Sequence, residues 1–376
     1  MTPKIAEFLR VQQPATPCLV LDVDRMEDNY RAITRALPLA RVYYAVKANP
    51  ARPILDRLVK LGSSFDAASF EEIRACLESG AAPSAISYGN TVKKVSAIRA
   101  AHAAGVSMFA FDSAEELEKL AENAPGARVY CRIMVANEGA DWPLSRKFGT
   151  SVESARELMS RAADMGLDPY GLSFHVGSQQ TSTASYEAAI GKVGMLFTDL
   201  KDAGINVRMV NLGGGFPIRY RDEVPGIDDF GAAIMHAMIA CFGNALPEML
   251  IEPGRSVVGN AGLVNAEVVL VSRREKDDPV RWVYLDIGRF GGLAETEGES
   301  IKYEIATPHD GTAMGPVALA GPTCDGADIL YEKSNYRLPL ALKSGDVVQI
   351  RSTGAYVTTY ASQAFNGFAP LAEHYI

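Results

Sequence analysis

A lysine near the end of an apolar segment is the residue of this chain best suited to covalent chemistry. Lys47 lies in the run Arg41-Val-Tyr-Tyr-Ala-Val-Lys-Ala-Asn49, whose aromatic and β-branched residues predict a buried parallel strand. Burial lowers the pKa of an amine, and a neutral amine is a nucleophile that forms a Schiff base with a carbonyl. The run by itself equally allows a lysine that reaches solvent at the strand end. Chemically matched residues elsewhere in the chain favour the Schiff base.

Two later segments carry residues that suit a phosphate group. Gly213-Gly-Gly215 follows an apolar run, and glycines let backbone N–H groups approach a phosphate with no Cβ in the way. Arg255, in Glu252-Pro-Gly-Arg255, can add a charge-assisted contact. A flexible turn and a surface ion pair are the alternative interpretations. The loops after the seventh and eighth strands of a barrel commonly hold phosphate, which favours the phosphate site.

A carboxylate and a histidine could act on a cofactor ring. Glu252, placed opposite a pyridine nitrogen, would keep that nitrogen protonated and make the ring a strong electron sink. His175 ends another apolar run and is followed closely by Ser178. A lone histidine is more often a core residue. No second histidine stands at metal-ligand spacing, so we predict no metal site.

The turn-rich segment Gly321-Pro-Thr-Cys-Asp-Gly-Ala-Asp328 places a thiol beside a carboxylate. The thiol of Cys324 can donate a proton, and the carboxylate of Asp325 can hold a cationic amine. An incidental loop cysteine is the alternative. Tyr356 could donate its hydroxyl group to a phosphate, or it could simply pack.

In the first part of the chain, short apolar runs alternate with amphipathic stretches. The eight runs span residues 42–46, 64–68, 85–88, 108–111, 128–135, 171–175, 209–212 and 249–251. This alternation predicts an α/β fold, a (β/α)8 TIM barrel, in which chemistry lies at the carboxyl ends of the strands. Lys47, Asp66, His175, Gly213–Gly215 and Glu252 all lie at or just after such ends.

The pattern then changes to Val/Ile-rich runs without long helices. These runs span residues 263–272, 281–286, 317–320, 347–351 and 356–359. They predict a C-terminal all-β, barrel-like domain, which the extended run 17–22 could join. We therefore predict a barrel over residues 25–255 and a β domain from residues 1–24 and 256–376.

Composition excludes several classes of function. The net charge of −8 argues against a nucleic-acid partner and an anionic membrane surface. No run of about 20 apolar residues predicts a membrane span. The N-terminal segment lacks the apolar core of a signal peptide, and the five cysteines form no CxxC pair. A cytoplasmic protein with reduced thiols is expected.

Taken together, these segments resemble the fold type III pyridoxal-phosphate-dependent decarboxylases of the alanine racemase-like group. The resemblance runs from about residue 17 to the C-terminus, and ornithine and lysine decarboxylases are the most similar members. It is carried by Tyr44-Ala-Val-Lys-Ala-Asn49, Phe65-Asp-Ala-Ala-Ser69, Arg146-Lys-Phe-Gly149, Phe174-His-Val-Gly-Ser178, Gly213-Gly-Gly-Phe-Pro217, Glu252-Pro-Gly-Arg255, Gly321-Pro-Thr-Cys-Asp-Gly326 and Gly354-Ala-Tyr356. Diaminopimelate decarboxylases usually carry Cys-Glu-Ser in place of Cys-Asp-Gly.

The resemblance implies a role for each matched residue. Lys47 would bind pyridoxal 5′-phosphate (PLP) as a Schiff base, His175 would stack on its ring and Glu252 would pair with its pyridine nitrogen. Cys324 would protonate the α-carbon from the other subunit of a homodimer whose active sites are shared across the interface. The remaining cofactor residues would be Asp66, Arg132, Ser178, Gly214, Gly215, Gly254, Arg255 and Tyr356.

The substrate implied by the resemblance is a basic amino acid, held by Asp325, Glu299 and Phe365. Ornithine decarboxylases typically place an aspartate where ungapped counting from Gly288-Arg-Phe-Gly291 gives Glu299. Glutamate is longer by one methylene, so it would shorten the pocket unless the loop retreats to fit lysine. The expected reaction is L-ornithine to putrescine, in polyamine biosynthesis. The alternatives are lysine or dual lysine/ornithine decarboxylation, then diaminopimelate or arginine decarboxylation.

Two other kinds of protein share this fold. Alanine racemases usually set an arginine against the pyridine nitrogen, and Glu252 argues against that reaction. Inactive regulatory binding proteins related to ornithine decarboxylase tend to lose cofactor residues. This chain keeps Lys47, Cys324 and the glycine loop.

Overall fold

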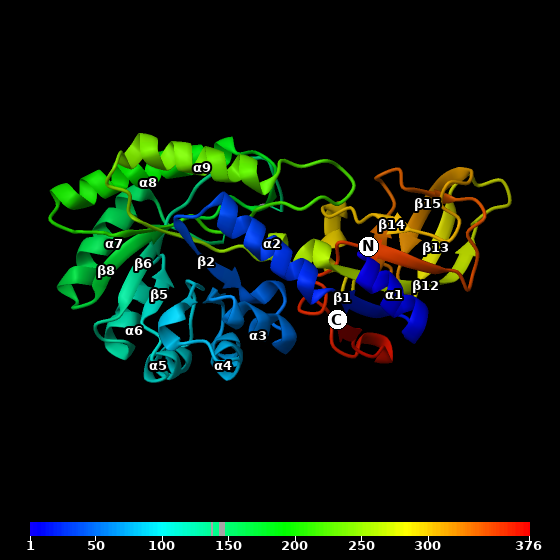
Figure 1. The fold of residues 1–376 in the computed structure, drawn as a ribbon, viewed down its shortest axis with the longest axis horizontal. Coiled ribbons are helices and arrows are strands. Elements are labelled where there is room, and N and C mark those ends of the chain that lie inside the picture. Colours follow the sequence, from blue (N-terminus) through cyan, green and yellow to red (C-terminus); the bar gives the residue numbers. More distant parts are fainter. Residues whose placement is uncertain (137, 143–146) are drawn as a thin grey trace. The chain divides into compact units, whose positions relative to one another are not determined.

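The computed structural model describes residues 1–136, 138–142 and 147–376, which form two compact units (Figure 1). The barrel unit comprises Glu27–Pro217 and Val224–Ser256. The β unit comprises Met1–Met26, Ile218–Glu223 and Val257–Ile376. None of the helices in the described part of the chain has the length and apolarity needed to cross a membrane.

Eight parallel strands close into a barrel, which confirms the predicted (β/α)8 fold. In order around the barrel they are β2 (Ala40–Ala45), β3 (Ser64–Ala67), β4 (Ile86–Tyr88), β5 (Met108–Phe111), β6 (Arg128–Arg132), β8 (Asp168–Ser173), β10 (Met209–Asn211) and β11 (Glu248–Ile251), and β11 pairs with β2. Each strand overlaps one of the predicted apolar runs. A two-stranded ribbon, β7 (Ala140–Trp142) and β9 (Ser178–Gln180), lies outside the barrel order.

Helices separate the strands of the barrel. They are α2 (Val23–Ala36), α3 (Arg52–Lys60), α4 (Phe70–Glu78), α5 (Val95–Ala103), α6 (Ala114–Asn123), α7 (Val152–Asp164), α8 (Ala184–Asp202) and α9 (Ile227–Phe242). The side chains of Ser69 and Ser113 accept hydrogen bonds from the N–H groups of Glu72 and Glu116. These bonds cap α4 and α6, so the serines fix where the chain leaves β3 and β5.

Side chains fill the interior of the barrel, as in other barrels of this kind. The cluster consists of Tyr43, Met108, Ala110, Tyr130, Tyr170, Met209 and Leu250. Near the amino ends of the strands, the guanidinium groups of Arg128 and Arg208 lie 4.9 and 5.1 Å from the centre of the Tyr170 ring. The barrel is therefore a packed core, and its chemistry must lie at the carboxyl ends of the strands.

The β unit is built on a nine-stranded sheet. Its strands are β1 (Cys18–Leu21), β12 (Gly262–Ser272), β13 (Arg281–Leu285), β14 (Ile305–Ala306), β15 (Met314–Ala320), β16 (Ile329–Tyr331), β17 (Arg337–Pro339), β18 (Val347–Arg351) and β19 (Ala372–Tyr375). The order is β14-β18-β12-β13-β15-β16, with β1 between β12 and β19 and with β17 beside β15. The predicted strand at 17–22 is confirmed as β1. Helix α1 (Pro3–Gln12) also belongs to this unit.

Two predictions about this region are wrong. Residues 356–359 form no strand, because Tyr356 has a positive φ of 58° and cannot be extended. Residues 218–223 group with the β unit, although the sequence placed them in the barrel. The reason is apolar packing, since Ile218 and Tyr220 belong to the core cluster of the β unit.

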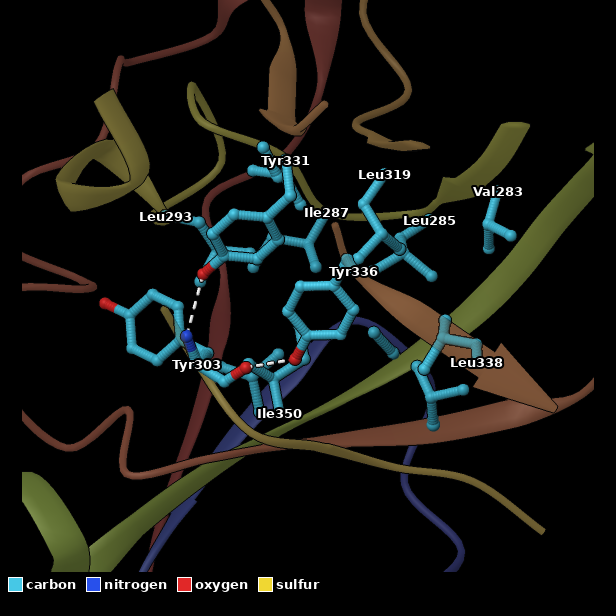
Figure 2. Packing of buried hydrophobic residues seen from close by; sticks show 14 of the residues in the cluster. Val283, Leu285, Ile287, Leu293, Tyr303, Leu319, Tyr331, Tyr336, Leu338 and Ile350 are labelled. Atoms are coloured by element: carbon cyan, nitrogen blue, oxygen red, sulfur yellow. Dashed lines mark hydrogen bonds between the residues drawn. The ribbon is translucent and has the colours of Figure 1, made fainter. Parts of the chain in front are cut away.

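Three tyrosines tie this core together, as Figure 2 shows. The hydroxyl group of Tyr331 accepts the N–H of Tyr303 at 2.8 Å and donates to the carbonyl of Ile301 at 2.7 Å. The hydroxyl group of Tyr336 donates to the carbonyl of Tyr303. Buried backbone between η4 (Ala294–Glu299) and β14 is therefore satisfied by side chains, since no strand partner is available there.

Candidate active site

Lys47 lies just past the end of β2, on the 3-10 turn Val46–Ala48. Its side chain is 48% exposed, so of the two interpretations of this run the lysine reaches solvent at the strand end. The strand ends at Ala45, and the turn carries the lysine to the open end of the barrel. Its Nζ lies 3.9 Å from Oδ2 of Asp66. An accessible amine beside a carboxylate can attack an aldehyde as a nucleophile.

Asp66, in β3, is the buried carboxylate of this site. Burial raises its pKa well above the ordinary value, and the nearby carboxylate of Glu252 raises it further, against the opposing effect of Lys47. Its Oδ1 has no hydrogen-bond partner among the described residues. A Cβ at Gly89 would overlap this oxygen, so only glycine fits there. Such a buried acceptor calls for a partner that the chain alone does not supply.

Glu252 follows β11 and is held by a neighbouring strand. Nδ2 of Asn211, at the end of β10, donates to Oε1 of Glu252. Oδ1 of Asn211 accepts the N–H of Gly213 at 2.9 Å. One amide therefore orients the carboxylate and starts the glycine loop. Sequence reasoning assigned no role to Asn211, although a polar residue that ends a buried strand is a usable signal.

The glycine loop packs directly against neighbouring backbone. Cβ atoms at Gly213, Gly214 and Gly215 would overlap the carbonyl oxygens of Phe174, Glu252 and Gly177, respectively. Gly213 and Gly215 also have positive φ angles of 69° and 104°. Close packing is therefore sufficient to require glycine, and it leaves a backbone surface without side chains at the end of β10.

His175 is a neutral ring at the end of β8. Burial lowers its pKa well below the ordinary value, and the positive charges of Arg132 and Lys47 lower it further. The N–H of Gly177 donates to Nδ1 at 3.0 Å, so Nε2 carries the proton. A neutral imidazole in a fixed tautomer offers a flat, uncharged face.

Arg132 ends β6 and supplies a second cation. Its guanidinium lies 5.0 Å from the centre of the Phe148 ring. Burial lowers its pKa, and the carboxylates of Glu252 and Asp112 oppose that shift. Phe148 belongs to the segment Arg146-Lys-Phe-Gly149, and Arg146 lies outside the described residues. The N–H of Gly149 donates to Asp112 at 2.7 Å, which anchors the rest.

A serine and an arginine of the barrel unit are joined by a hydrogen bond. Nη2 of Arg255 donates to Oγ of Ser178 at 3.2 Å, and Arg255 is only 4% exposed. Gly254 precedes the short helix α10 (Arg255–Val258), which starts from this arginine. A buried cation and a hydroxyl group form a donor set that suits a phosphate.

The remaining predicted residues lie in the β unit. Cys324 and Asp325 are exposed on the loop between β15 and β16. The N–H of Cys324 donates to Oδ1 of Asn366 at 2.8 Å, and the ring of the adjacent Phe365 lies 4.7 Å from that of Phe290. Asn366 is a second residue that sequence reasoning missed, and its polar type in a loop gave no specific signal.

Glu299 has a role in the fold. Its Oε1 accepts the N–H groups of Glu332 at 2.7 Å and of Lys333 at 2.6 Å, so at least one of its oxygens supports the chain after β16. Tyr356 lies in the β unit near Gly354, in the left-handed conformation already described.

Comparison with known proteins identifies this arrangement. The model of the family described as pyridoxal-dependent decarboxylase, pyridoxal binding domain, matches residues 23–259. The chain belongs to the pyridoxal-dependent decarboxylase family. It is a carboxy-lyase, and its cofactor is PLP.

Relatives of this decarboxylase cover nearly its whole length. The lysine/ornithine decarboxylase of Selenomonas ruminantium is 37% identical over 356 residues, which is 94% of this chain and 88% of the relative. A crystal structure of SrLDC in complex with PLP and cadaverine has a TM-score of 0.88 at 34% identity, covering 100% of this chain and 93% of the other. The lysine/ornithine decarboxylase of Vibrio vulnificus complexed with cadaverine has a TM-score of 0.89 at 31% identity, covering 100% and 99%.

The barrel residues of this decarboxylase fit PLP chemically. Lys47 is an accessible amine for the aldehyde, and Glu252 is a fixed carboxylate for the ring nitrogen. His175 offers a neutral face, and Arg255 with Ser178 offers donors for the phosphate. The buried Oδ1 of Asp66 has no partner in the described chain, as expected of a site that a ligand completes.

Proposed function

We propose that this decarboxylase converts L-ornithine to putrescine and CO2. The single observation that carries the proposal is the exposed Cys324–Asp325 pair, which sets a proton donor beside an anion on one loop. An anion there selects a substrate whose far end is a cation, and ornithine carries such an ammonium group. The 37% identical relative is named a lysine/ornithine decarboxylase, which supports a basic amino acid as the substrate.

The barrel residues hold the cofactor and tune it. When bound, PLP supplies a ring that accepts the electron pair released as CO2 leaves. Lys47 holds the aldehyde carbon through Nζ, and Glu252, oriented by Asn211, keeps a proton on the ring nitrogen. Neutral His175 covers the ring without adding charge. The remaining contacts come from Asp66 and Arg132, and, at the phosphate, from Ser178, Gly214, Gly215, Gly254, Arg255 and Tyr356.

The β-unit loop completes the reaction in this proposal. The thiol of Cys324 donates a proton to the α-carbon after CO2 has left, and Asp325 binds the distal ammonium group. Phe365 lies at the same end of the substrate site, and Glu299 shapes that end through the backbone it holds at 332–333. We propose that the enzyme is a homodimer in which this loop of one subunit serves the barrel of the other. The exposure of both side chains in the single chain supports that assignment.

L-Lysine is the second candidate substrate. Relatives named lysine/ornithine decarboxylase, one of them solved with cadaverine, favour it. The position of Glu299 also favours lysine. Its Oε1 accepts the N–H groups of residues 332 and 333, so this oxygen points toward the backbone and does not take up room beside a substrate. The pocket would then keep room for one more methylene group.

A substrate panel decides between these candidates. Purified enzyme with PLP is given L-ornithine, L-lysine, L-arginine and meso-diaminopimelate, and each product is identified by mass while CO2 is counted. We expect putrescine to form with the highest kcat/KM, followed by cadaverine. A higher kcat/KM for lysine would replace ornithine as the main substrate. No CO2 from any of the four would refute the proposed function.

A further inference from the structure

Asp328, to which no role has been assigned so far, is a buried carboxylate that joins two loops of the β unit. It is 3% exposed and directly precedes β16. Its Oδ2 accepts the N–H of Thr323 at 3.1 Å and the hydroxyl group of Thr323 at 2.7 Å. Its Oδ1 accepts the N–H of Arg289 at 2.7 Å. The carboxylate therefore receives three hydrogen bonds from residues outside β16.

Two glycines make room for this carboxylate. A Cβ at Gly288 or at Gly321 would overlap an oxygen of Asp328. Gly288 opens the Gly-Arg-Phe-Gly turn, and Gly321 opens the Gly-Pro-Thr-Cys-Asp-Gly segment. Both glycines are required by the carboxylate of Asp328 and by the close approach of their own backbones to each other. The cradle is sized for aspartate, because the extra methylene of glutamate would have to enter the same space.

The residues that hydrogen-bond to Asp328 lie on both sides of Cys324 in the chain. Thr323 is its chain neighbour, so the two bonds to Thr323 fix the backbone on the N-terminal side of the thiol. On the C-terminal side, the N–H of Asp328 donates to the carbonyl of Asp325 at 3.1 Å. The turn that Asp328 holds carries Phe290, which packs on Phe365 next to the Asn366 that binds the N–H of Cys324. One carboxylate thus organises both supports of the cysteine.

We propose that Asp328 is a positioning residue that aims the thiol of Cys324 at the α-carbon. This inference rests on the proposed role of Cys324. If the thiol is displaced, the electron pair left by CO2 is protonated at the former aldehyde carbon of PLP. The α-carbon then stays double-bonded to nitrogen. Water then hydrolyses its C=N bond, so the substrate leaves as an amino aldehyde and the amino group stays on the cofactor as pyridoxamine phosphate. Displacement of the Cys324 thiol should therefore change the product as well as the rate.

The test compares Asp328→Asn with Asp22→Asn in the holoenzyme. Whichever way an asparagine at 328 is turned, its NH2 group faces one set of N–H or O–H donors. Asp22 is a matched control in the same unit, because its carboxylate also accepts one threonine hydroxyl, from Thr2 at 2.7 Å, and two backbone N–H groups. The partners that the described structure gives this carboxylate, which also include Lys4 at 3.9 Å, all lie outside the two loops. Diamine, amino aldehyde and pyridoxamine phosphate are measured by mass together with the melting temperature.

We expect Asp328→Asn to lower kcat for diamine by about 10- to 100-fold and to raise the share of turnovers that end in aldehyde. Asp22→Asn should lower the melting temperature without changing the product ratio. If Asp328→Asn keeps the wild-type product ratio, the positioning role is refuted. If Asp22→Asn raises the aldehyde share equally, the effect is general destabilisation and the proposal is also overturned.

A second readout does not depend on turnover. Cys241 and Cys324 are the exposed cysteines of the described chain, so in a Cys241→Ser background iodoacetamide reports on Cys324 alone. In Asp328→Asn the rate of Cys324 alkylation should change at least about threefold, because the thiol no longer lies in the position that Thr323 and Asn366 set. An unchanged rate would contradict the proposal. Cys324→Ala tests the proposed function separately. Normal diamine release by that variant would refute the acid role of Cys324. The alkylation result would still show whether Asp328 fixes the position of the thiol.

Discussion

The barrel unit and the β unit hold their functional residues in different ways. In the barrel, Asp66, His175 and Arg255 are fixed by burial and by the ends of strands. In the β unit, Cys324 and Asp325 are exposed on a loop, and the buried carboxylate of Asp328 accepts hydrogen bonds from Thr323 of that loop. The difference indicates a division of labour. In the proposed function, the barrel supplies the buried charged groups for the cofactor, and the loop supplies the groups that meet the substrate.

Removing the amine of Lys47 should have the largest effect. Lys47→Ala should abolish both the absorbance of the Schiff base and CO2 release, because no other accessible amine lies beside Asp66 in the described barrel. Lys47→Arg is the matched control, since it keeps the charge but not the nucleophile. Visible absorbance and activity are measured after dialysis against PLP. Activity retained by the alanine variant would contradict the assignment.

Removing the charge of Glu252 should come next. Glu252→Gln keeps the shape and the bond from Asn211 but loses the anion that keeps the ring nitrogen protonated, so we expect kcat to fall about 100-fold with little change in PLP binding. Asn211→Leu, which leaves the charge but frees the carboxylate, should cost about tenfold. A smaller loss for Glu252→Gln than for Asn211→Leu would reverse the proposed order of roles.

Asp325 and Glu299, two of the acids of the β unit, should respond differently. Asp325→Asn should raise the KM for ornithine by about tenfold, since the distal ammonium loses its anion. Glu299→Gln should change KM by less than about threefold, because the glutamine oxygen can still accept the two N–H groups at 332–333. Steady-state kinetics of both variants check this. Equal losses would make Glu299 a substrate residue.

The smallest effect concerns stability of the barrel. Burial lowers the pKa of Lys93 to about 8, although Glu116 lies 2.8 Å away. Because its folded pKa lies below the unfolded value, the unfolded chain binds more protons above pH 8. The free energy of unfolding should therefore rise by roughly 1–3 kcal/mol between pH 8 and 10.5 relative to Lys93→Met. Urea unfolding of both proteins at pH 8 and 10 measures it, and parallel curves would contradict it.

Much of the barrel could be predicted from the sequence, because strands buried on both faces are continuous apolar runs. The run around Lys47 left its exposure open, and the exposure is decided by β2 ending at Ala45. The failed strand at 356–359 has a similar cause, because apolar composition gives no sign of a positive φ at Tyr356. Contacts between loops far apart in the chain, such as Asp328 with Arg289, leave no periodic signal at all.

The central claim is that Nζ of Lys47 carries PLP covalently. Reduction of the holoenzyme with borohydride, followed by proteolysis and mass spectrometry, tests it directly. The account predicts one phosphopyridoxyl group per chain, on the peptide that contains Lys47. A label on another lysine, or no label on a protein that decarboxylates ornithine, would contradict it.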